Sequence, residues 1–151
     1  MHLRVLDDST VEAKRKTEVR VVGIAEVEVS GSRFIICNTH FTWTPDGKTD
    51  QYQLEDLPKL LSILEHVGEF VLCGDFNAPR GKEIFDELAR RYTDNVPPRF
   101  TSSIDGTRHK HGALHIVVDG IFSTSPYVIR DFSMVHGVSD HCALTATVTR
   151  K

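Results

Sequence analysis

The chain has 151 residues, of which 40% are apolar and 26% charged, and this composition predicts a globular domain with a real core rather than a disordered segment. The net charge of −3 excludes a generally basic surface that would clamp nucleic acid by charge alone. The three cysteines, Cys37, Cys73 and Cys142, are odd in number and adjoin apolar runs, which predicts reduced, buried thiols in a cytoplasmic protein. No apolar run reaches the length of a membrane span, and the first ten residues lack the apolar core of a signal peptide.

The first half of the sequence predicts strands followed by a helix. Alternating or continuous apolar residues place strands at residues 2–6, 19–29 and 34–37, with an exposed loop at 7–16 that carries a basic cluster and a hairpin turn at 30–32. Thr49 or Asp50 can cap a helix that runs to about His66. Its predicted apolar stripe is Leu54, Leu57, Leu61 and Leu64. Pro58 inside this pattern predicts a kink or a later start of the helix.

The second half predicts one more helix among strands and loops. A short buried strand begins at Phe70, and a helix over residues 81–91 turns Ile84, Phe85 and Leu88 to one face. Further extended segments are expected at residues 100–103, 114–122, 127–132 and 142–148. We find no repeat, low-complexity tract or linker, so we expect residues 1–151 to form a single domain of mixed strands and helices.

Polar residues of catalytic type recur at the ends of these strands. Asp75 and Asn77 follow the strand that begins at Phe70, and they point to the same side if extended geometry continues past Gly74. The alternative is a turn in which both side chains bond their own backbone. His40 follows another strand and is, taken alone, an ordinary strand-end histidine.

The last strand is preceded by Asp140 and His141. Asp140 alone can be explained as the cap of a turn beside Ser139. Asp119 differs, because it falls inside an apolar run, where an unpaired carboxylate is costly to bury. A histidine is its natural partner, and the carboxylate would fix the ring and favour its protonated form. Phosphoester hydrolysis needs such a proton-handling group, an oriented water and a cation that offsets charge.

Four segments resemble, in order, the motifs of the endonuclease/exonuclease/phosphatase superfamily, the DNase I-like proteins. They are Asn38-Thr39-His40, Gly74-Asp75-Phe76-Asn77, Val118-Asp119-Gly120-Ile121-Phe122 and Ser139-Asp140-His141. The resemblance covers roughly residue 17 to the C-terminus. It implies an α+β fold with a mostly antiparallel mixed sheet and helices on one face, which is half of a four-layer α/β/β/α sandwich. It also implies a Mg²⁺- or Mn²⁺-dependent phosphodiesterase or phosphomonoesterase, and hard oxygen ligands agree with magnesium.

The resemblance also implies roles for single residues. Asp75 would orient or deprotonate the attacking water, and Asn77 would hold a phosphate oxygen or help to place Asp75. Asp140 would be a metal ligand.

Three further residues receive roles around the phosphate. His141 would contact the scissile phosphate and would be oriented by Asp119. His40 would be a second histidine there, stabilising charge or assisting proton transfer.

The chain resembles only the later part of this family. The family's metal-binding Glu usually follows Gln; no Gln-Glu pair occurs here, and neither Glu12 nor Glu18 has a matching context. The half-fold leaves one sheet face open, which predicts a homodimer or higher oligomer in which two sheets pack together. The alternative to the homodimer is that the sequence is a piece of a longer chain. The alternative to an active enzyme is a catalytically impaired half-domain that acts as a binding or assembly module.

The loops between the motifs do not identify the substrate. Trp43 could stack on a base or sugar, or pack its own loop, and the basic residues 108–111 could contact phosphates or be solvated. Nothing in the sequence selects DNA over a phosphoinositide, sphingomyelin or a small phosphoester. The eight histidines match no zinc-site spacing.

Overall fold

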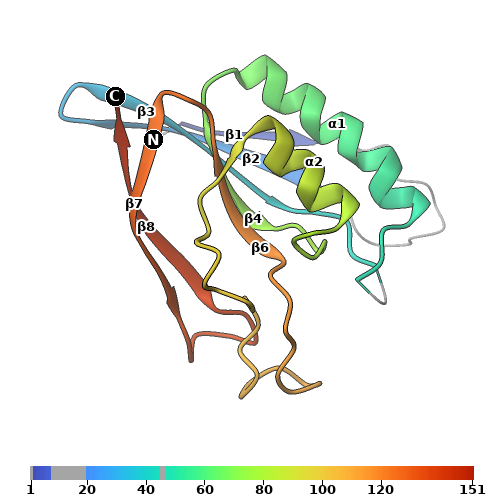
Figure 1. Cartoon of the computed structure of the whole chain (residues 1–151). Helices are drawn as coiled ribbons and strands as arrows, with labels where there is room; N and C mark the ends of the chain where they lie inside the picture. Colours follow the sequence, from blue (N-terminus) through green and yellow to red (C-terminus); the bar gives the residue numbers. More distant parts are fainter. Residues whose placement is uncertain (1, 8–19, 45–46) are drawn as a thin grey trace.

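The computed structural model describes residues 2–7, 20–44 and 47–151. Within these residues six strands form a mixed sheet in the order β1-β2-β3-β4-β6-β5, where β3 and β4 are parallel and all other neighbours antiparallel (Figure 1). These strands are β1 (His2–Asp7), β2 (Val21–Val29), β3 (Ser32–His40), β4 (Val71–Asp75), β5 (Thr93–Asp94) and β6 (Asp119–Ser123). The remaining strands, β7 (Tyr127–Val135) and β8 (Ala143–Arg150), form a separate antiparallel pair. The basic cluster predicted in the loop at 7–16 lies outside the described residues.

Helices α1 (Gln51–Val67) and α2 (Glu83–Arg91) begin close to the predicted positions. Asp50, not Thr49, caps α1: its Oδ1 accepts the Gln53 backbone N–H at 3.0 Å. The helix runs continuously through Pro58, so the predicted later start is wrong. The stripe is also wrong at Leu54, which is 44% exposed, whereas Leu60 is buried.

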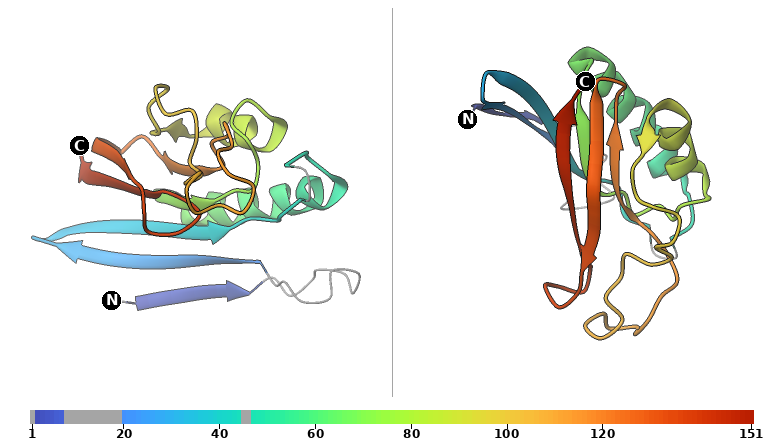
Figure 2. Two further views of the ribbon diagram at one scale, coloured as in Figure 1. Left: turned by 90° about the horizontal axis from the view of Figure 1, so that it is seen from below. Right: turned by 60° about the vertical axis from the view of Figure 1, so that its left-hand side comes forward.

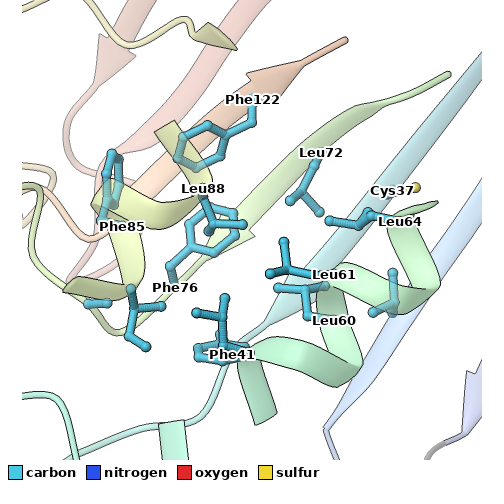
Figure 3. Close-up of a cluster of buried hydrophobic side chains, with 14 of the residues drawn as sticks. Cys37, Phe41, Leu60, Leu61, Leu64, Leu72, Phe76, Phe85, Leu88 and Phe122 are labelled. Atoms are coloured by element: carbon cyan, nitrogen blue, oxygen red, sulfur yellow. The ribbon is translucent and has the colours of Figure 1, made fainter. Parts of the chain in front are cut away.

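The main core lies between the helices and one face of the six-stranded sheet (Figure 3). Predicted inward residues of α2, Ile84, Phe85 and Leu88, are all fully buried there. Phe85 packs against Phe76 and Phe122, with ring centroids 6.2 Å and 5.0 Å away. This aromatic group fixes α2 against the ends of β4 and β6, and thereby fixes the backbone that carries the predicted site.

The opposite face of the sheet is partly covered by β7 and β8, so the expectation of a wholly open face is wrong. In the second view of Figure 2 this hairpin crosses the sheet on the side away from the helices. A second core joins them, with Val71, Ile121 and Tyr127 buried in it. The Tyr127 hydroxyl also accepts the Ile35 backbone N–H at 3.0 Å. The hairpin covers β3, β4 and β6 because these strands supply the apolar partners of its inner side chains.

The largest differences from the predicted strands fall between α2 and β7. β6 begins at Asp119 rather than at residue 114, since the backbone of residues 116–118 bonds instead to Ser103, Phe76 and Arg80. Residues 100–103 form no strand, and the short β5 lies where no strand was predicted. Asp119 is therefore the first residue of its strand rather than an interior one, which brings it to the same sheet edge as Asp75.

The three cysteines are free, as predicted, although Cys73 is only half-buried. Burial raises the pKa of the Cys37 thiol to about 12, and the neighbouring Cys73 adds to this shift. Cys37 is thus a core residue without nucleophilic character at neutral pH. No helix in the described part of the chain has the length and hydropathy needed to cross a membrane.

Candidate phosphoester site

The predicted site lies at one edge of the six-stranded sheet, where β3 and β4 end and β6 begins. The strand register places Asp75 beside His40 on the parallel side and beside Asp119 on the antiparallel side. Three residues predicted from separate segments therefore share one edge, as the sequence motifs implied.

Phe76 sets the direction of its neighbour Asp75. The Phe76 ring is fully buried in the aromatic group of the core (Figure 3), so the Asp75 side chain turns away from this core. The Asn77 backbone N–H donates to Asp75 Oδ1 at 2.7 Å, and Asn77 has a φ of 50°. The Asp75 side chain therefore forms the turn that the sequence offered as the alternative, whereas Asn77 departs from extended geometry and its side chain bonds the Phe41 carbonyl.

Asn77 is held from two directions. Its Nδ2 donates to the Phe41 carbonyl at 2.8 Å, and its own carbonyl accepts from Gln53 Nε2 at 3.1 Å. Gln53 is 1% exposed and also donates to the Thr42 carbonyl at 2.7 Å. Sequence reasoning missed Gln53, and its only signal was an amide on the buried side of α1.

Asp119 and His141 form the pair that the cost of a buried carboxylate predicted. His141 Nδ1 lies 2.8 Å from Asp119 Oδ2, and the two side chains are 28% and 13% exposed. Ser103 is fully buried and its Oγ accepts the backbone N–H groups of Val118 and Asp119 at 3.0 Å and 3.2 Å. An isolated bridge between Ile104 and His141 brings the histidine to this edge.

The surroundings of two residues in the site raise their pKa values. The pKa of His141 rises to about 9, first because Asp119 bonds its ring and then because Asp119, Asp75 and Asp140 are negative, although burial opposes the shift. The pKa of Asp75 is raised, mainly by burial and next by Asp119. His141 is therefore an imidazolium at neutral pH, and the Asp75 carboxyl binds a proton more readily than an ordinary aspartate.

The remaining predicted residues lie farther out. His40 Nε2 is 3.5 Å from Asp75 Oδ2, and its side chain is 65% exposed. Asp140 is exposed, and its backbone carbonyl accepts the Asp105 N–H at 2.9 Å. Ser139, rather than Asp140, caps the turn, since its Oγ accepts the His141 N–H at 3.0 Å.

The residues at this edge fit a hard cation through their carboxylates. Ligand atoms of Asp75, Asp119 and His141 all lie within 4.8 Å of one another, and we call these three residues the carboxylate–imidazole cluster. An imidazolium cannot ligate a metal, so the two carboxylates are the donors that suit Mg²⁺ or Mn²⁺. Asp140 is outside this group of described residues, and its role as a metal ligand stays a prediction.

A cleft of about 470 Å³ opens beside the cluster and is bordered by Asn77 and His141. Its walls come from Trp43 after β3 and from residues 109–116 before β6. In Figure 1 the latter segment extends as a gold loop beyond the end of the sheet. The sequence did not decide whether the basic loop residues, Lys110 among them, contact phosphates or are solvated, and the fold places them at this cleft.

The strand order, the two helices on one face and the cluster at the sheet edge are those of one class of proteins. The chain has part of the fold of the endonuclease/exonuclease/phosphatase proteins. No protein-family model and no curated protein matches the sequence. Among solved structures, an endonuclease/exonuclease/phosphatase from Bacteroides vulgatus matches all of this chain with a TM-score of 0.73 and 18% identity.

Two further structures show the range of proteins that share this fold. A mannosyl-6-phosphatase from Bacteroides thetaiotaomicron matches 98% of the chain with a TM-score of 0.72 and 13% identity. TDP2 from D. rerio, complexed with a single-strand DNA product, matches 99% with a TM-score of 0.65 and 15% identity. The chain spans only 66%, 66% and 67% of the three matched structures. The likeness establishes a partial fold of this class.

Proposed function

We propose that the chain hydrolyses a phosphoester, as a phosphodiesterase or phosphatase, at the carboxylate–imidazole cluster. The observation that carries this proposal is the convergence of Asp75 with the Asp119–His141 pair at one strand edge. A half-buried carboxylate with a raised pKa suits a base, and an imidazolium suits a developing phosphate charge. Asp75 therefore acts on the attacking water, and His141 acts on the phosphate.

The chain's own residues act on water and on phosphate. Asp75 orients the attacking water and accepts its proton as the new bond to phosphorus forms and the ester bond breaks. His141, whose Nδ1 is directed to Asp119, presents its Nε2 proton to a phosphate oxygen. His40 adds a second imidazole near the same position, and Asn77 holds Asp75 through the backbone bond to Oδ1.

A divalent cation is part of the proposal. Mg²⁺ or Mn²⁺, when bound by the carboxylates of Asp119 and Asp140, would supply charge neutralisation at the phosphate beside the Asp75 base. The glutamate that the family uses for this purpose has no counterpart in the described residues, so we expect weak metal affinity.

Hydrolysis of bis-p-nitrophenyl phosphate and p-nitrophenyl phosphate tests the proposal. We expect turnover that requires Mg²⁺ or Mn²⁺ and that falls about 10²- to 10⁴-fold in His141→Ala, because the phosphate loses its charged donor. The matched control is His66→Ala, since His66 lies exposed on α1, where its Nδ1 is 2.6 Å from the Ser62 carbonyl oxygen of the same helix. Equal activity in His141→Ala and wild type would assign the turnover to a contaminant, and no turnover at all would favour a binding module.

We also propose that two copies associate through β2. The register pairs Ala25 with Ile36 and Val27 with Phe34, so the odd-numbered residues of β2 face the hairpin side of the sheet. The hairpin core does not include them, and Val29 at the end of this row is 55% exposed. An uncovered apolar row on a sheet face fits a second sheet of the same kind.

Light scattering tests this association directly. We expect a mass of twice 17.0 kDa for the wild type and a shift to the monomer for Val27→Asp, because a carboxylate in the interface would be buried unpaired. Glu28→Gln, whose side chain lies on the other face of the same strand, should leave the dimer unchanged. A wild-type chain that stays monomeric at all concentrations would contradict the proposal.

A further inference from the structure

The cleft beside the cluster has an unusual distribution of charge. Its polar border carries His141, His109, Lys110, His111 and His115, and none of the described residues that line it is acidic. The whole chain is nevertheless acidic, with a net charge of −3. A local excess of cationic and N–H donor groups in a concave site is suited to a phosphate that is bound at a distance from the reacting one.

The loop that carries these groups is held in shape by a buried aspartate. Asp105 is 1% exposed; its Oδ1 accepts from Thr107, and its Oδ2 accepts the Gly137 N–H at 2.7 Å. These hydrogen bonds hold the pKa of its carboxyl well below the ordinary value, at about 2. Asp105 thus ties the basic loop, which we define as residues 107–115, to the segment that leads into His141.

Further contacts close the basic loop on itself. A Cβ on Gly106, the residue before the loop, would lie 2.6 Å from the Ala113 Cα, so the chain returns too close to Gly106 for a side chain there. The His111 backbone N–H donates to His109 Nδ1 at 3.3 Å, which leaves Nε2 of a neutral His109 as the N–H donor. The loop is therefore an ordered wall that presents donors, and not a solvated tail.

The facing wall supplies a flat apolar surface. Trp43 follows β3, is 53% exposed and borders the same cleft as Lys110. Ile104, Leu114 and Val118 add apolar surface between the two walls. The volume of about 470 Å³ lies within the range of pockets for small molecules.

We propose that this cleft selects a small substrate that carries two phosphate groups on one ring system. The reacting phosphate lies at His141 and Asn77, the ring lies against Trp43, and the second phosphate is bound by Lys110 and the histidines of the basic loop. This inference rests on the proposed phosphoester chemistry for the position of the first phosphate. The ring can be a nucleobase with its ribose or a sugar alone, because either can carry two phosphate groups.

Binding can be measured without catalysis, because Trp43 is the chain's one tryptophan and reports on the cleft by fluorescence. The probes are adenosine 3′,5′-bisphosphate and fructose 1,6-bisphosphate, each compared with its monophosphate, in the presence of a chelator. We expect each bisphosphate to bind about tenfold more tightly than its monophosphate, because its second phosphate gains one charge-assisted contact. Lys110→Ala should reduce this ratio to near one, because the bisphosphate loses the charged contact of its second phosphate. The matched control is Lys82→Ala, an exposed lysine before α2 that does not line the cleft.

The outcomes separate this inference from the proposed function. A ratio that is present in the wild type and lost in Lys110→Ala supports the second-phosphate site, even if no ester is hydrolysed. A ratio near one for both ring types, or a ratio that Lys110→Ala leaves intact, overturns it even if bis-p-nitrophenyl phosphate is turned over. If only adenosine 3′,5′-bisphosphate binds more tightly than its monophosphate, the Trp43 surface binds a nucleobase. If both bisphosphates show the same gain in affinity, the Trp43 surface accepts either ring.

Discussion

Asp75→Asn is expected to lower the rate of phosphoester hydrolysis by about 10²- to 10⁴-fold while the fold remains intact. The asparagine Oδ1 can still accept the Asn77 N–H, which is 2.7 Å from Asp75 Oδ1, so the turn after β4 is preserved. The amide cannot take a proton from water, and this is the function that the proposal assigns to Asp75. Steady-state kinetics with Mg²⁺ and urea denaturation of the same preparations test the two effects together.

The same substitution is expected to stabilise the chain at neutral pH. The pKa of the Asp75 carboxyl is raised above 3.8 in the folded chain, by burial first and by Asp119 next. Between 3.8 and the raised value, the folded chain holds more protons than the unfolded chain, so the free energy of unfolding falls as pH rises through this interval. Asn carries no such proton, and the variant lacks this fall.

The difference in free energy of unfolding should therefore be small at low pH, grow as pH rises through that interval and level off above it. Urea denaturation with a chelator present, from acid to neutral pH, measures it without any bound cation. Asp131→Asn is the control: Asp131 is exposed on β7 with a φ of 52°, a conformation that asparagine accepts, and its stability should follow the wild type. A variant that keeps its activity, or that is less stable than wild type at neutral pH, would show that Asp75 is a structural residue.

Much of the site could be predicted because its residues carry strong local signals. Asp75 ends an apolar run, and the burial of the adjacent Phe76 turns the Asp75 side chain away from the core. The partner of Asp119 followed from the cost of an unpaired carboxylate, and the 2.8 Å contact with His141 answers that requirement. In both cases the physical demand is local and does not depend on the rest of the fold.

The supporting residues could not be found in this way. Ser103, Asp105 and Gln53 are polar residues in ordinary loop or helix contexts, and each matters because of chain segments that are distant in sequence. Asp105 reads as a turn residue, yet it joins the basic loop to the loop before His141. Such roles arise only when the tertiary contacts exist.

The errors in the predicted fold also arise from tertiary contacts that the local sequence does not specify. The apolar stripe of α1 was assigned to Leu54 because leucines at several phases fit a helical period, and only the position of the sheet decides for Leu60. The alternation in β7 indicates a half-buried strand without saying what covers it. Its packing on β3, β4 and β6 closed part of a face that the sequence left open.

Gly74→Ala is expected to prevent stable folding more severely than any other single substitution of a described glycine. Gly74 has a φ of 150°, and a Cβ there would lie 1.9 Å from the carbonyl oxygen of Thr39. That oxygen belongs to β3, whose parallel register pairs Thr39 with Gly74 directly. The neighbour is backbone in the centre of the sheet and cannot rotate away as a side chain would.

Relief of this clash would require β3 and β4 to separate next to Asp75. We expect a loss of about 3 kcal/mol or more in the free energy of unfolding, since overpacking and backbone strain each cost about 1–3 kcal/mol. The loss should appear as a large decrease in the urea midpoint, or as insoluble protein on expression. Phosphoesterase activity should fall with it, because His40 and Asp75 are placed by the same strand pair.

Gly23→Ala is the matched control for this prediction. Gly23 lies in β2 of the same sheet, and the nearest atom to its Cβ would be the Asn38 carbonyl oxygen at 3.8 Å, an ordinary contact distance. We expect its urea midpoint to stay close to that of the wild type. Equal midpoints for Gly74→Ala and wild type would mean that β3 and β4 do not approach as closely as the register requires, and the juxtaposition of His40, Asp75 and Asp119 would lose its structural basis.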